Sequence, residues 1–246
     1  MVKTIIKKIL NTNPIDTDTI LNLKKKFIHN QRGFNYGLIR RFVDCLYCHA
    51  TPGTIETTIE IISKYPNGGK LLNLGGGTGQ VANIFKELGY DVYNLDIDIK
   101  KIDENDKNIN FDLNSGDKFP FEEKSFDIVV CQEIIEHIES PWKLFRDVKS
   151  MIKSDGIFIL STPNISSMQS RLKFLFTGYF SWFTPDSRDY HINPLPHWEI
   201  LLIADKTGFE KGQLFGSGDY FYKKTNTSDK KTILKNEGLI YSFKLR

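Results

Sequence analysis

The sequence predicts an α/β protein in which a doubly wound, mostly parallel sheet carries helices on both faces. Three observations support this fold class: stretches with strand and helix character alternate from about residue 70, a glycine-rich turn joins the first strand to the first helix, and polar residues follow several strands. Strands that alternate with helices pair in parallel, and such sheets bind ligands at the carboxyl ends of their strands. We therefore expect a ligand site where these polar residues lie.

The first 67 residues are expected to form a helical cap ahead of the sheet. Three stretches have helical patterns: residues 17–27, 35–49 and 54–64. The last of them lies between Pro52-Gly53 and the run Pro66 to Gly69, and proline and glycine of this kind are typical of element boundaries. We therefore predict one unit over residues 1–67 and a second over residues 68–246.

From residue 68 onward the expected elements follow in a regular order. Strands are expected near residues 70–74, 91–95, 109–112, 126–131 and 156–161. Helices are expected between these strands, near residues 79–88 and 141–153. A helix over 199–207 and strands near 209–215 and 237–245 complete the pattern. The polar, lysine-rich residues 223–236 are expected to be a solvent-exposed loop.

The most informative stretch is the glycine-rich turn after the first strand. Gly75, Gly77 and Gly79 form a G-x-G-x-G pattern, and Asp96 ends the next strand. Glycine lets the backbone turn tightly and approach a ligand, a helix N-terminus supplies unpaired N–H groups, and a strand-end acid can accept hydrogen bonds from a ribose diol. A dinucleotide-binding G-x-G-x-x-G does not fit because Gln80 follows, and a phosphate-binding loop does not fit because no Gly-Lys-Ser/Thr follows.

Together with later motifs, this pattern resembles the class I S-adenosylmethionine (SAM) methyltransferases. The later matches follow the third, fourth and fifth strands: Asp112-Leu113, the run Phe119 to His137 (FPFEEKSFDIVVCQEIIEH), and the run Met151 to Asn164 (MIKSDGIFILSTPN). The resemblance covers roughly residues 68–210. It implies a Rossmann-like, seven-stranded sheet with an antiparallel last strand, SAM as cofactor, and S-adenosylhomocysteine as product.

The resemblance also implies which residues bind the cofactor. The implied set is Asn73, Gly75, Gly76, Gly77, Gly79, Asp96, Ile97, Asp112, Leu113 and Gln132. In it, Asp96 would accept hydrogen bonds from the ribose, and Asp112 with the Leu113 N–H would bind adenine, although Asp112 also suits a purely structural turn. Asn73 departs from the family, which usually has Asp or Glu there. Asparagine keeps an acceptor oxygen but lacks the charge, so we expect binding to weaken by about 1 kcal/mol.

Residues after the fourth strand are candidates for the chemistry. Glu136 and His137 lie where the family's acceptor meets the methyl group, and His191 is the expected general base because an imidazole with a near-neutral pKa can take a proton from a hydroxyl. Glu133, Glu136 and His137 also resemble the E-x-x-E-H of ubiquinone-pathway and small-RNA 2′-O-methyltransferases, in which a divalent ion is held, and His191 or His197 would complete such a site. The sequence leaves open whether a metal binds or whether these residues only hold the loop.

Residues 165–198 interrupt the alternation and are expected to form an insertion on the acceptor side. Its aromatic residues are expected to pack in the core, to cover a sugar or quinoid acceptor, or to contact a membrane through residues 171–183. The Asn-Pro-Pro-Tyr/Phe signature of amino-group methylation is absent after the fourth strand. The leading expectation is therefore methylation of a small or glycan-type acceptor at a hydroxyl. The alternatives are a quinone precursor, an RNA 2′-hydroxyl, or a SAM-binding partner protein without activity.

Composition limits the partners and the compartment. The 246 residues carry a formal net charge of +3, which is too small to argue for nucleic acid as a partner. Three cysteines do not make an even disulfide framework, no apolar stretch is long enough to span a membrane, and the first residues lack a secretory signal. We therefore expect a cytoplasmic protein. The oligomeric state and the identity of the acceptor stay open.

Overall fold

The computed structural model describes residues 50–51, 53–65, 68–77, 79–98, 107–218 and 229–246. The helices predicted over 17–27 and 35–49 lie outside these residues. Every described residue belongs to one compact unit of the chain. No helix in these ranges is long and apolar enough to cross a membrane.

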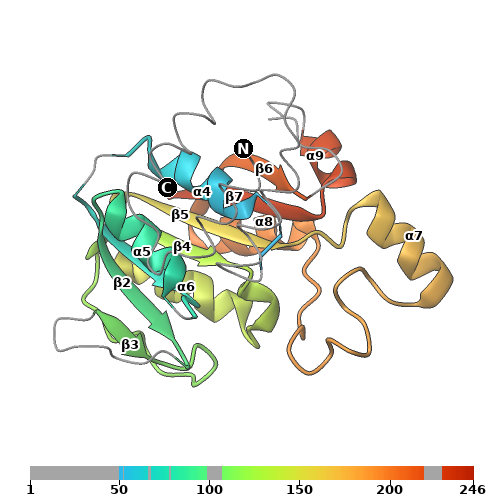
Figure 1. Ribbon diagram of the computed structural model, residues 1–246, viewed down its shortest axis with the longest axis horizontal. Helices are drawn as coiled ribbons and strands as arrows, with labels where there is room; N and C mark the ends of the chain where they lie inside the picture. Colours follow the sequence, from blue (N-terminus) through green and yellow to red (C-terminus); the bar gives the residue numbers. More distant parts are fainter. Residues whose placement is uncertain (1–49, 52, 66–67, 78, 99–106, 219–228) are drawn as a thin grey trace, which may run out of the picture. The chain divides into compact units, whose positions relative to one another are not determined.

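A seven-stranded sheet forms the centre of the fold (Figure 1). Its strands are β1 (Lys70–Leu74), β2 (Asp91–Asp96), β3 (Asn108–Asn110), β4 (Phe126–Gln132), β5 (Ile152–Pro163), β6 (Phe209–Ser217) and β7 (Gly238–Leu245). They lie in the order β3-β2-β1-β4-β5-β7-β6, and β7 is antiparallel to both of its neighbours while β1 to β5 pair in parallel. The predicted sheet with an antiparallel last strand is confirmed.

Helices cover both faces of this sheet because alternate residues of the parallel strands are buried on each side. The helices are α4 (Thr54–Ile62), α5 (Gln80–Glu87), α6 (Pro141–Met151), α7 (Met168–Thr177), α8 (His197–Thr207) and α9 (Asp229–Lys235), and a short 3-10 helix is η1 (Ile135–His137). Leu72 and Val129 point into the core that contains α6 and α8. Their neighbours Leu71 and Ile128 are also fully buried, so they point to the opposite face.

Four phenylalanines hold α6 against the sheet. The ring of Phe145 on α6 lies 5.3 Å from Phe158, 5.8 Å from Phe209 and 5.6 Å from Phe243, measured between ring centroids. All four are fully buried, and the three contacts of Phe145 are edge-to-face, which is a favourable arrangement for aromatic rings. This cluster joins β5, β6 and β7, so it positions the strand from which the insertion leaves.

Helix α9 contradicts one expectation from the sequence. Residues 229–235 were expected to belong to a solvent-exposed loop over 223–236, and the structure shows that this is wrong for residues 229–235. Thr232 is 1% exposed, and the helix contacts β6 and α7. The polar composition of this short helix would not stabilise it alone, and burial against neighbouring elements does.

Other differences concern boundaries. The strand predicted over 156–161 extends from Ile152 to Pro163, because Ile152 pairs with Phe126 and Pro163 pairs with Gly238. The strand predicted over 109–112 ends at Asn110. Helix α4 belongs to the expected cap and contacts β6 and β7. A separate cap over residues 1–67 stays a prediction.

Candidate functional site

The glycine-rich turn between β1 and α5 closes against the end of β2. The N–H groups of Gly75 and Gly76 both lie close to the Leu95 carbonyl oxygen, at 2.8 and 3.3 Å. Gly75, Gly77 and Gly79 have φ angles of 69°, 51° and 80°, in the left-handed region that favours glycine. The predicted turn therefore needs glycine at these three positions for its backbone conformation.

A buried pair of asparagines lies under the turn. Asn73 on β1 donates from Nδ2 to Oδ1 of Asn94 on β2 at 2.8 Å, and Nδ2 of Asn94 has no hydrogen-bond partner among the described residues. A Cβ atom on Gly76 would lie 1.6 Å from Oδ1 of Asn94, so only glycine fits there. Asn94 was not identified from the sequence, where the one available sign was a polar residue inside an otherwise buried strand. Asn73, where the family usually has Asp or Glu, is therefore one half of a neutral amide pair.

Asp96 ends β2 beside the turn. Its Oδ2 accepts the Gly77 N–H at 2.8 Å, and its Oδ1 accepts the Asp98 N–H at 3.0 Å. The next residue, Ile97, is 54% exposed. The carboxylate thus lies at the carboxyl end of its strand, which is where a ribose binds in folds of this type. Its role in binding ribose stays a prediction.

The other predicted cofactor residues lie at the ends of β3 and β4. Asp112 is exposed, and its Oδ1 accepts the Asn114 N–H at 2.8 Å, so it does hold a turn. Leu113 is half-buried against the core. Gln132 donates from Nε2 to the Thr58 hydroxyl at 2.8 Å, which ties α4 to the end of β4. Adenine binding by Asp112 and the Leu113 N–H, and cofactor binding by Gln132, stay predictions.

The backbone changes direction directly after β4. Glu133 has a φ angle of 51°, which is uncommon for residues other than glycine and often marks functional sites. Its carboxylate accepts hydrogen bonds from the hydroxyls of Ser161 at 2.8 Å and Thr51 at 3.2 Å. Burial raises the pKa of Glu133 to about 7, although these hydrogen bonds act in the opposite direction. Glu133 therefore connects β4 to β5 and to the residues before α4.

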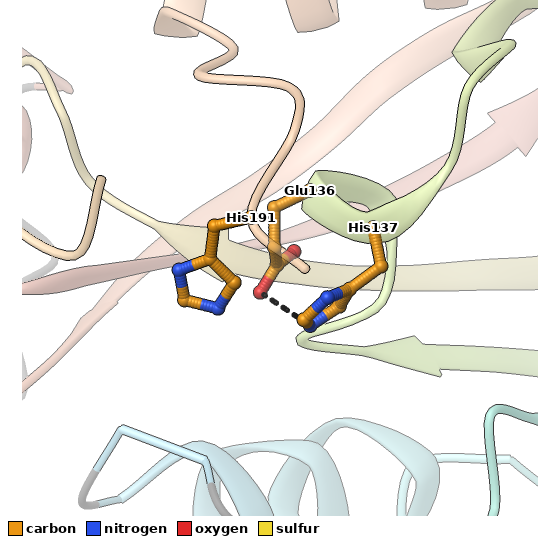
Figure 2. A group of neighbouring side chains, drawn as sticks. All are labelled: Glu136, His137 and His191. Atoms are coloured by element: carbon orange, nitrogen blue, oxygen red, sulfur yellow. Dashed lines mark ion pairs between the residues drawn. The ribbon is translucent and has the colours of Figure 1, made fainter. Parts of the chain in front are cut away.

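Glu136, His137 and His191, the three predicted catalytic residues, lie together (Figure 2). One ligand atom from each lies within 4.8 Å of the others. Oε2 of Glu136 accepts the Thr162 hydroxyl at 3.1 Å, whereas Oε1 has no hydrogen-bond partner in the described part of the chain and lies 4.0 Å from Nε2 of His137. Burial, together with the nearby Glu133 carboxylate, raises the pKa of Glu136 well above its usual value.

Backbone carbonyls orient both imidazoles. Nδ1 of His137 lies 2.7 Å from the Tyr190 carbonyl oxygen, and Nδ1 of His191 lies 2.6 Å from the Trp182 carbonyl oxygen. A carbonyl can only accept, so each Nδ1 carries the proton, and Nε2 of each neutral ring keeps its lone pair. Burial lowers the pKa of His137, which favours this neutral form. The pair can therefore accept a proton or bind a metal through Nε2.

Two further residues predicted near this group point elsewhere. Glu133 is held by Ser161 and Thr51, as described above, and His197 lies 3.0 Å from the Tyr241 hydroxyl through Nδ1. Of the two histidines considered for completing a metal site, the structure brings His191 to the group and places His197 against the core. The unpartnered Glu136 oxygen and the two imidazole nitrogens are a donor set that fits a divalent transition ion.

Comparisons with known proteins bear on the family and the fold of this chain. The chain matches a family model described as a methyltransferase domain over residues 46–214. A ubiquinone biosynthesis O-methyltransferase of Rickettsia canadensis is 30% identical over 181 residues, which cover 70% of this chain and 76% of that protein. The corresponding protein of Rickettsia conorii is 27% identical over 68% of this chain, but the match spans 60% of its length, which is less than two thirds.

Solved structures show the same fold. A SAM-dependent methyltransferase from Archaeoglobus fulgidus aligns with a TM-score of 0.56 at 15% identity, over 77% of this chain and 92% of that chain. A putative methyltransferase from Bacillus halodurans aligns with a TM-score of 0.57 at 14% identity, over 77% of this chain and 97% of that chain. With the glycine turn, the strand-end acid and the motif after β4 in place, this chain belongs to the class I SAM-dependent methyltransferases and uses SAM as its cofactor.

Proposed function

We propose that the enzyme methylates a hydroxyl group of a small acceptor and that His191 is the general base. The observation that carries this proposal is the group of Glu136, His137 and His191, in which each imidazole, when neutral, presents an unprotonated Nε2. The hydroxyl oxygen attacks the methyl carbon of SAM, the carbon–sulfur bond breaks, and its electron pair stays on sulfur to give S-adenosylhomocysteine. The hydroxyl proton passes to Nε2 of His191.

His137 and Glu136 are positioning residues in this proposal. Glu136 is buried with an unpartnered Oε1 at 4.0 Å from Nε2 of His137, so in its ionised form it favours positive charge in the space between the two histidines. A proton arriving at His191 is stabilised by that charge. The names of the Rickettsia relatives, which specify O-methylation, support a hydroxyl rather than an amine as acceptor.

The same residues fit a divalent ion as an alternative to direct proton transfer. Oε1 of Glu136, Nε2 of His137 and Nε2 of His191 would hold it. Such an ion would supply positive charge that favours the ionised hydroxyl. Removing metal with a chelator distinguishes the two: activity that persists after chelation leaves proton transfer to His191 as the mechanism.

A cavity lined mostly by polar residues supports a sugar-type acceptor. It measures about 220 Å³ and is lined by Asn164, Ser167, Gln169, Lys173, Ser181, Trp182 and Glu237. Trp182 is the one aromatic residue among those that line it, and its carbonyl orients His191. Hydrogen-bonding groups around one ring suit a polyhydroxylated molecule. The relatives instead favour a phenolic quinone precursor, which is the second candidate.

The test is transfer of a labelled methyl group from SAM to a panel of sugars, catechols and short RNAs, with His191→Ala compared with wild type. General-base catalysis contributes about 10²- to 10⁴-fold, so kcat should fall by at least about 100-fold while SAM affinity is unchanged. His197→Ala is the matched control and should retain kcat, because its imidazole faces Tyr241. An equally active His191→Ala enzyme would exclude His191 as the base. SAM binding without turnover of any acceptor would indicate a non-catalytic partner protein.

A further inference from the structure

Lys173 lies on the inner side of α7. All ten residues of this helix are exposed except Ser170, which is fully buried, and Lys173, which is half-buried. Residues three apart lie on the same side of a helix, so both face the rest of the protein. Lysine is among the residues that are least often buried unless they are paired. An inward-facing ammonium on a helix with ample exposed surface therefore indicates a role in binding.

The polar cavity that contains Trp182 is lined by two opposite charges. Lys173 contributes from α7, and Glu237 contributes from the position just before β7. Lys173 forms no ion pair with any carboxylate in the described part of the chain, Glu237 included. The two charges thus line one cavity without a direct ion pair between them, and the ammonium is left for a ligand.

The rest of the lining suits one hydroxylated ring. Ser167 accepts the Ser170 N–H through its Oγ at 3.1 Å, so its own O–H can still donate. The Glu237 carboxylate can accept from hydroxyl groups, and Trp182 offers a flat apolar face. The volume of about 220 Å³ is below the roughly 300–1,000 Å³ of pockets for drug-sized ligands, which favours a single ring with one substituent.

A second cavity adjoins the first and adds positive charge. It measures about 230 Å³, shares Ser167, Gln169 and Glu237 with the first cavity, and is also lined by Lys235. Together the two cavities are lined by two lysines and one carboxylate. Clefts lined by an excess of one charge concentrate ligands of the opposite charge, so this pair of cavities favours an anion.

We propose that the acceptor is a hydroxylated ring with an anionic group, as in a sugar phosphate or a sugar acid, and that Lys173 binds this group. The inference rests on the proposed function, because it names the acceptor class of the same enzyme. An ammonium forms strong, charge-assisted hydrogen bonds with phosphate and carboxylate oxygens. Lys173 determines specificity and takes no part in proton transfer. A ring held against Trp182 is tied to the segment that carries the base, because the Trp182 carbonyl orients His191.

The experiment is isothermal titration of the full chain with matched sugars. The neutral set is glucose, galactose and mannose, and the anionic sets are their 1-phosphates and their uronic acids. Wild type should bind at least one anionic sugar about tenfold more tightly than its neutral parent, and Lys173→Met should lose this preference. Lys173→Arg keeps the charge and should retain it. Lys86→Met, at an exposed position on α5, is the matched control and should bind as wild type does.

Comparison of the phosphates with the uronic acids identifies which anion Lys173 binds. Absence of binding by every anionic sugar, equal affinity for the neutral parents, or an undiminished preference in Lys173→Met would overturn the proposal. Unchanged SAM affinity shows that each variant is folded. His191→Ala should bind these sugars as wild type does and should fail only in methyl transfer. A failure of the proposed function therefore appears in turnover, whereas a failure of this inference appears in sugar affinity.

Discussion

Asp96 accepts the Gly77 N–H at 2.8 Å, so the carboxylate predicted to bind the SAM ribose also holds the glycine turn in place. Each carboxylate oxygen has two lone pairs, and each of the two oxygens of Asp96 already accepts one backbone N–H. One acceptor position on each oxygen is left for a ribose hydroxyl. The residue is therefore expected to act on the cofactor and on the shape of the loop around it.

Replacing Asp96 with alanine should raise the dissociation constant for SAM by about 10- to 100-fold. Hydrogen bonds to a charged group are worth about 1.5–3 kcal/mol, and about 1.4 kcal/mol corresponds to a factor of ten. Isothermal titration with SAM and S-adenosylhomocysteine measures this change. Asp98→Ala removes an exposed neighbouring carboxylate and should leave affinity nearly unchanged. Equal affinity of Asp96→Ala and wild type would remove Asp96 from the cofactor site.

Alanine at Gly76 and at Gly77 should have different effects. A Cβ on Gly76 would overlap Asn94, whereas a Cβ on Gly77 has no atom within 4 Å and meets only the unfavourable φ of 51°. Gly77→Ala should therefore cost about 1–2 kcal/mol of stability, and Gly76→Ala should cost more and displace β1 from β2. Urea unfolding and SAM titration of both variants measure this. A Gly76→Ala protein as stable as Gly77→Ala would contradict the close contact with Asn94.

Glu133 should make the protein less stable as pH rises. Its pKa is about 7 in the folded protein against 4.5 for a free glutamate, so the folded state keeps a proton that the unfolded chain loses. The stabilising contribution is complete below pH 4.5 and disappears as pH rises through about 7, by up to about 3 kcal/mol. Urea unfolding from pH 4 to 9 should show this slope. Glu133→Gln should reduce this slope, although Glu136, whose pKa is also raised, keeps its own share of it. The exposed Glu123→Gln should not change the slope, and an unchanged slope in Glu133→Gln would refute the assignment.

Glu136→Gln should increase stability at pH 8 while reducing activity. Glutamine has the same shape, can still accept the Thr162 hydroxyl, and removes a buried carboxylate that has one unpartnered oxygen. Burying such a charge is costly, so the free energy of unfolding should rise by about 1 kcal/mol or more. Methyl transfer should slow because positive charge at His191 loses its stabilising neighbour. Glu139→Gln, at an exposed position, should change neither quantity, and a loss of both stability and activity in Glu136→Gln would indicate a purely structural residue.

The sheet and the cofactor turn could be predicted because their signals are local. The glycines at 75, 77 and 79 indicate positive φ angles, which few other residues adopt. Asp96 is the last residue of its strand, so its place at the strand end can be predicted from the strand pattern alone. The buried Asn73 and Asn94 pair could not be predicted in the same way. It depends on the register of β1 against β2, which brings two residues 21 positions apart into contact.

The insertion was harder to predict because its contacts are long-range. His191 was expected near Glu136 and His137, and the structure places it there, but the carbonyls of Trp182 and Tyr190 that orient both rings carry no sequence signature. Helix α9 was missed because its stability comes from contacts with β6 and α7 rather than from composition. Burial against other elements determines whether such a short helix forms, and the helix propensities of its residues do not reveal that burial.

The insertion begins where β5 ends and returns to η1 at Ile192 and Asn193, whose N–H groups both donate to the Glu136 carbonyl oxygen at 3.0 Å. Side chains also hold both attachment points: the Asn164 amide donates to the carbonyls of Ile233 and Asn236, and the Asn193 amide donates to the Ile138 carbonyl. The demands therefore fall on these two asparagines more than on the residues between them. Evolution can therefore replace the acceptor-facing sequence without disturbing the cofactor half of the enzyme. A chimera in which the residues between Ser167 and Tyr190 are replaced by those of a relative is expected to show the acceptor preference of that relative.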